Sequence, residues 1–175
     1  MSIKEYDKMK NKLMIPTLKE WGKYDNDLDL KEIHKLFFGK SNSDVYYYYK
    51  NMACISRADE LLFLNKKVFQ YYIYSFVLYL LSDLGKDDDE AKEVFLSLLI
   101  SREKHDSKSV CEIYEKKVKI ECIDENFDKD DFFISLYDIV CLIKEAYEVG
   151  EIDKELYDKL PDLIIEIEKK CQISC

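Results

Sequence analysis

The fold is decided by the stretch VFQYYIYSFVLYLL, which runs from Val68 to Leu81. Gln70 and Ser75 are its only side chains that are neither aromatic nor aliphatic. A helix that is apolar on all sides is surrounded by other elements, because a surface helix keeps one polar face. Its 14 residues fall short of the roughly 20 that cross a bilayer. The stretch therefore predicts a buried central helix at about residues 66–84, and no contact with a membrane.

The composition of the whole chain agrees with a helical domain. Of 175 residues, 47% are hydrophobic and 14% are aromatic, with four glycines and two prolines. Disordered chains lack such apolar mass, and scarce Gly and Pro argue against the many tight turns of a sandwich or barrel. We expect an all-α fold, with residues 1–175 forming one bundle of about seven to nine helices.

Signals for helix starts and stops recur along the chain. Thr17 and Glu20 have the form of a capping box, and Gly39 suits the left-handed residue that ends a helix. Apolar residues at helical spacing predict a strongly amphipathic helix from Phe132 to about Gly150. Residues 118–123 instead alternate apolar and charged side chains, which is typical of a short strand.

The chain has six cysteines: Cys54, Cys111, Cys122, Cys141, Cys171 and Cys175. A chain of this length needs no disulfide to fold, since folding removes roughly 68–70% of its surface from water. The first residues are charged and show no apolar segment followed by a cleavage site, so no secretory signal is visible. We therefore expect reduced thiols and a cytoplasmic location.

Charge is distributed unevenly along the chain. Residues 1–80 carry 13 basic and 10 acidic side chains, whereas residues 81–175 carry 14 and 26, so the net values are +3 and -12. An acidic surface repels nucleic acid and attracts basic partners. We expect no direct binding to nucleic acid. Two interpretations stay open for the acidic residues, a solvated face that keeps the protein soluble and a surface that binds a partner.

Groups suited to catalysis are scarce. The histidines are His34 and His105, and His105 and its neighbour Asp106 do not face each other on a helix. The four glycines are too far apart for a phosphate-binding or dinucleotide-binding loop. The acidic segment 124–131 lacks the sixth-position Gly of a calcium loop. We expect no catalytic residue, no cofactor and no metal.

Several short motifs resemble a family of small all-helical bacterial proteins. They are LFFGKS at 36–41, RADELLFL at 57–64, VFQYY at 68–72 and the apolar segment 91–99. Some members resemble immunity proteins, which are encoded beside toxins of contact-dependent growth inhibition or other polymorphic toxin systems. The resemblance implies a cytoplasmic, non-enzymatic protein that binds its cognate toxin domain. It transfers no catalytic residue.

An acidic protein of this kind suits a basic toxin, such as a ribonuclease or other nuclease. Its carboxylates would mimic phosphates, and a patch of roughly 800 Å² per partner would block the active site. Tyrosines are favoured as anchors at such interfaces. The candidate partner-binding residues are Asp87, Asp88, Asp89, Glu90, Asp124, Glu125, Asp128, Asp130, Asp131, Tyr46 and Tyr47.

Two other classes of protein remain open. The central apolar helix also suits a viral adaptor with a Bcl-2-like bundle, whose groove binds an amphipathic helix. The chain lacks the Asn-Trp-Gly-Arg sequence of such adaptors, although Trp21-Gly22 is present. A small enzyme using Cys or His is the third class. Genome context distinguishes the first two, and alanine substitution of His34, His105 and Cys54 tests the third.

Overall fold

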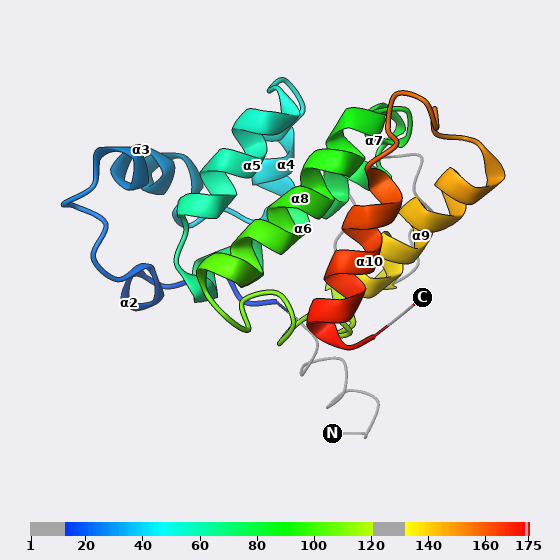
Figure 1. The fold of residues 1–175 in the computed structure, drawn as a ribbon. Helices are drawn as coiled ribbons and strands as arrows, with labels where there is room; N and C mark the ends of the chain where they lie inside the picture. The colour runs from blue at the N-terminus through cyan, green and yellow to red at the C-terminus, as the bar shows by residue number, and fades with distance from the viewer. Residues whose placement is uncertain (1–12, 121–131, 174) are drawn as a thin grey trace, which may run out of the picture.

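The computed structural model describes residues 13–120, 132–173 and 175 (Figure 1). These residues form nine helices and one two-stranded antiparallel sheet, which confirms the mostly helical class. None of the described helices is both long enough and apolar enough to cross a membrane. The elements are α2 (Leu18–Trp21), α3 (Leu28–Phe37), α4 (Asn42–Tyr49), α5 (Cys54–Phe63), α6 (Lys66–Leu81), α7 (Asp83–Lys86), α8 (Asp89–His105), β1 (Val118–Ile120), β2 (Phe132–Ile134), α9 (Leu136–Val149) and α10 (Leu160–Cys171).

Helix α6 is the predicted central helix, and its side chains are buried from Val68 to Leu80. Helices α2, α4, α5, α7 and α8 contact it. Gln70 and Ser75, which are buried in this helix, have partners, because Gln70 donates to the Ser109 carbonyl at 3.2 Å and Ser75 donates to the Tyr72 carbonyl at 2.5 Å. The buried helix is thus confirmed, and the side chains of Gln70 and Ser75 each have a hydrogen-bond partner, as buried polar groups require.

Helix α6 ends at Leu81, three residues before the expected end. Ser82 adopts an extended backbone conformation, and its hydroxyl accepts a hydrogen bond from the Gly85 amide at 3.2 Å. A serine in this position starts a new helix, since its side chain satisfies an amide of the first turn. The short helix α7 therefore turns back against the last turn of α6.

Gly85 allows this close packing. A Cβ atom at Gly85 would collide with the Tyr79 carbonyl oxygen and would lie 2.6 Å from its carbonyl carbon and 2.8 Å from Leu80 Cα. All three atoms belong to the backbone, which cannot rotate away as a flexible side chain can. Only a residue without a side chain fits between α7 and α6 here.

We expect Gly85→Ala to lower the free energy of unfolding by about 3 kcal/mol, the cost of a severe overpacking. Gly39→Ala is the control, because Gly39 has φ +75° but no atom within 4 Å of an added Cβ. The strain of a left-handed alanine there costs about 1 kcal/mol. Urea unfolding of both variants measures the difference, and equal losses would contradict the packing explanation.

Strand β1 confirms the first three residues of the short strand expected at 118–123, and residues 121–123 lie outside the described residues. The helix expected from Phe132 was wrong at its start. Val118–Ile120 pairs antiparallel with Phe132–Ile134, and α9 begins at Leu136. Ser135 caps α9, because its hydroxyl accepts from the Asp138 amide at 3.2 Å and its own amide donates to Asp138 at 2.7 Å. The backbone before this cap is thereby free to pair with β1.

The expectation of reduced cysteines was wrong for four of the six. Helix α10 lies beside α8 and α9 (Figure 1), and this brings the C-terminal cysteines to partners far back in the sequence. The disulfides are Cys111–Cys171, with Cα atoms 4.9 Å apart, and Cys141–Cys175, at 5.5 Å. Both distances suit a disulfide. Cys54 is buried and free, and Cys122 lies outside the described residues.

Candidate functional site

A groove of about 760 Å³ lies between the end of α6, α7, the start of α8, and α9. Its floor consists of Leu80, Leu81, Ile139, Leu142, Ile143 and Ala146, and its rim of Lys86, Asp87, Asp89, Lys92 and Glu151. Pockets for small molecules combine apolar walls with a few convergent polar groups. The described residues of this floor are all apolar, and the polar groups of the groove are the five charged side chains of its rim.

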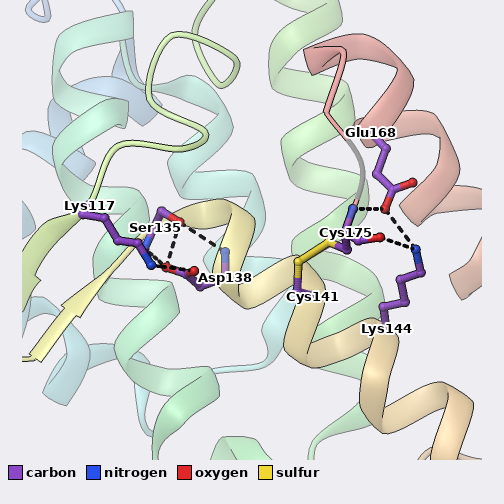
Figure 2. Close-up of a disulfide and its surroundings, with 7 residues drawn as sticks. All are labelled: Lys117, Ser135, Asp138, Cys141, Lys144, Glu168 and Cys175. Atoms are coloured by element: carbon purple, nitrogen blue, oxygen red, sulfur yellow. Dashed lines mark hydrogen bonds and ion pairs between the residues drawn. A yellow bond between two sulfur atoms is a disulfide. The ribbon is translucent and has the colours of Figure 1, made fainter.

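Helix α9 forms one wall of the groove, and its opposite face is fixed to α10 (Figure 2). Cys141 is bonded to Cys175, and Lys144 donates to Glu168 at 3.2 Å and to the Cys175 carbonyl at 3.5 Å. The groove-lining residues of α9 recur every three or four positions, as one helical face requires. Each face of this helix therefore has its own role, one lining the groove and one holding α10.

The start of α9 is anchored as well. Figure 2 shows Asp138 between Ser135 and Lys117, whose ammonium lies 2.6 Å from the carboxylate. The side chains of Lys117 and Ser135 and the Ser135 amide bind the Asp138 carboxylate, which holds its pKa below the ordinary value despite burial. Together with the disulfide at Cys141, these contacts fix the wall of the groove in place.

The rim of the groove has an unbalanced negative charge. Its two lysines are each neutralised by the carboxylate three residues earlier. The ion pairs are Lys86–Asp83 at 3.2 Å and Lys92–Asp89 at 2.6 Å. Within residues 13–120, 132–173 and 175, no ion pair is formed by Asp87 or Glu151. A partner that covers the rim therefore meets two uncompensated carboxylates.

The carboxylates near the start of α8 also raise the pKa of two nearby groups. Loss of hydration raises the pKa of the Tyr157 phenol, and four carboxylates within residues 88–93 raise it further. Burial likewise raises the pKa of the Cys54 thiol, and Glu90 and Asp88 add to the effect. A negative potential opposes loss of a proton, since the product is an anion. The acidic residues between 87 and 93, called the acidic run below, therefore raise the pKa of a thiol on α5 and of a phenol on the segment before α10.

The structure gives the four predicted acidic residues of this run different roles. Asp87 and Asp89 lie on the rim, and Glu90 is exposed beside them. Asp88 instead caps α8, accepting from the Ala91 amide at 3.0 Å and from the Tyr79 hydroxyl at 2.6 Å. Because its carboxylate is engaged within the fold, Asp88 has a structural role.

Tyr46 and Tyr47 lie on α4, which does not line the groove. Tyr47 is 49% exposed and Tyr46 is half-buried. The other two tyrosines of the run pack inward, since Tyr48 donates to Glu60 at 3.1 Å and Tyr49 is fully buried. The remaining candidates, Asp124, Glu125, Asp128, Asp130 and Asp131, lie outside the described residues.

The histidines occupy different surroundings. His34 stacks between the rings of Tyr24 and Phe38, with centroids 3.6 and 4.6 Å away, and burial lowers its pKa. His105 lines a second hollow, of about 830 Å³, at the other end of α8. Besides His105, the described residues that line this hollow include three with a positive charge and one with a negative charge. No group of three or more metal-ligating side chains occurs in the described part of the chain.

Sequence reasoning missed the floor of the groove. Ile143 belongs to the apolar pattern that predicts this helix, whereas Leu142 lies outside that pattern. In the structure Ile143 is 4% exposed but Leu142 is 48% exposed. Glu151 resembled any surface acid. No known protein family, curated protein or solved structure matches this chain.

Proposed function

We propose that this chain is an immunity-type binding protein, which neutralises a basic toxin domain by covering its active site. One observation carries the proposal: an apolar floor lies inside a rim where Asp87 and Glu151 have no ion-pair partner in the described residues. Protein interfaces combine an apolar centre with a polar rim. The unbalanced carboxylates select a basic partner, and a ribonuclease or other nuclease has the basic surface required.

Rim carboxylates act mainly on the rate of association. Charges of opposite sign steer two proteins together before contact, so such charges change the association rate and its salt dependence more than the dissociation rate. Once bound, the apolar floor excludes water and holds the partner. This mechanism needs no catalytic group, and the partner's substrate is kept out by occlusion.

The test is co-expression with the product of the adjacent gene, followed by binding kinetics with purified proteins. We expect this chain to restore growth of cells that the partner arrests. Charge reversal in Asp87→Lys with Glu151→Lys is expected to slow association about tenfold at low salt. Asp59→Lys is the control, since Asp59 is an exposed carboxylate of α5, which does not line the groove. An unchanged rate and an unchanged salt dependence would overturn the proposal.

A further inference from the structure

Helices and the segments that join them build the described part of the groove. The lining residues that the structure describes come from α6, α7, α8 and α9, with Asp87 after α7 and Glu151 after α9, and none of them belongs to a strand. A peptide that binds by strand addition needs a free sheet edge, whereas an amphipathic helix needs an apolar groove. The floor residues of α9 cover two turns, roughly 10 Å along its axis. The groove thus has the character of a site for about two turns of a helix.

Leu142 is the floor residue of α9 that is most exposed to solvent. It is 48% exposed, while its neighbours Ile139 and Ile143 are 2% and 4% exposed. An exposed aliphatic side chain in an apolar groove marks an interaction surface. Its burial by aliphatic side chains of a partner helix is favourable.

The charges decide which helix fits. The lysines of the rim are bound to Asp83 and Asp89, and Asp87 and Glu151 have no ion pair with another described residue. An acidic helix would place like charges together, which disfavours binding. A helix with Lys or Arg beside its apolar stripe would place cations against both free carboxylates. The charge of the rim therefore favours binding of a basic amphipathic helix.

We infer that the groove binds one basic amphipathic helix of the partner, with aliphatic side chains on the floor and Lys or Arg side chains at Asp87 and Glu151. The inference rests on the proposed function, since this helix belongs to the protein that the chain neutralises. The proposed function names a basic partner, and this helix is the part of that partner that would enter the groove.

Two synthetic helical peptides test the inference. They share one leucine stripe, and their flanking positions are all Lys in one and all Glu in the other. By fluorescence anisotropy with the full chain, we expect the Lys peptide to bind at least tenfold more tightly than the Glu peptide. Asp87→Lys with Glu151→Lys is expected to reverse this order, because the rim charge is reversed.

A matched pair of variants locates the site. Leu142→Ala is expected to weaken binding of the Lys peptide about tenfold, through loss of apolar burial. Phe63→Ala is the control, because Phe63 is 52% exposed and lines the second hollow at the other end of α8. It should leave the affinity unchanged. Circular dichroism confirms that both variants are folded.

The outcomes separate the inference from the proposed function. Equal affinity for both peptides, no binding of either, or equal effects of Leu142→Ala and Phe63→Ala overturns the inference. If the partner's association still depends on Asp87 and Glu151 in that case, the proposed function stands without the helix. If the peptides bind as expected but the adjacent gene product does not bind, the proposed function fails and the groove's specificity stands.

Discussion

Removal of both disulfides is expected to lower the free energy of unfolding by about 2–4 kcal/mol for each bond. The bonds join residues 60 and 34 positions apart, so each closes a long loop. A long loop loses more entropy when closed in the unfolded chain, which ranks Cys111–Cys171 above Cys141–Cys175 by roughly 0.5 kcal/mol. At this chain length a loss of 1 kcal/mol lowers the melting temperature by about 2–4 °C.

The measurement compares thermal unfolding with and without reductant. Two double variants distinguish the contributions of the two bonds: Cys111→Ser with Cys171→Ser, and Cys141→Ser with Cys175→Ser. Cys54→Ala is the control, since Cys54 is buried and forms no disulfide, and this variant should keep the full response to reductant. A melting temperature that reductant does not change would show that the four cysteines are not paired.

The same chemistry tests the compartment. The expected cytoplasmic location predicts free thiols in protein alkylated at the moment of cell lysis. Two disulfides in the folded chain favour an oxidising environment instead. Mass spectrometry of the alkylated protein shows which cysteines were free. Protection of Cys111, Cys141, Cys171 and Cys175 would contradict the cytoplasmic prediction.

Local signals in the sequence predicted local structure well. The stretch at 68–81 is apolar on every side, and it forms the buried helix α6. Thr17 and Glu20 form the predicted capping box of α2, in which the Thr17 amide donates to Glu20 at 2.8 Å, and Gly39 has the predicted positive φ. Each of these features depends on side chains within a few residues of one another. Their physical causes are therefore visible in the sequence alone.

Features that depend on distant contacts could not be predicted. The strand β2 and both disulfides need partners that only the folded chain brings near. The acidic run shows the same limit, since Asp87 and Asp88 are equivalent in sequence. One is exposed on the groove rim and the other caps α8. The sequence predicts an acidic surface, and only the folded chain shows which of its carboxylates lie on the groove rim.

Replacement of Arg57 by methionine is expected to cost about 3–5 kcal/mol, the penalty for breaking a buried charge pair by removing one partner. The side chain of Arg57 is 2% exposed and lies 3.6 Å from the carboxylate of Asp88. It also donates to the carbonyls of Tyr49 at 2.6 Å and Met52 at 2.7 Å. Its guanidinium lies 3.8 Å from the centre of the Tyr79 ring.

Arg57 therefore joins the end of α4, which carries Tyr46 and Tyr47, to Asp88, the cap of α8, which is next to the rim residue Asp87 in the sequence. Methionine has a similar volume but no donor, so both carbonyls and Asp88 lose a partner. Urea unfolding measures the cost, and a loss below about 1 kcal/mol would contradict this role. Arg102→Met is the matched control, because Arg102 is equally buried but donates to one carbonyl and to an Asp106 whose side chain is 40% exposed. We expect Arg102→Met to lower the free energy of unfolding less than Arg57→Met does. If the affinity for the Lys peptide also falls only with Arg57→Met, Arg57 positions the rim as well as stabilising the fold.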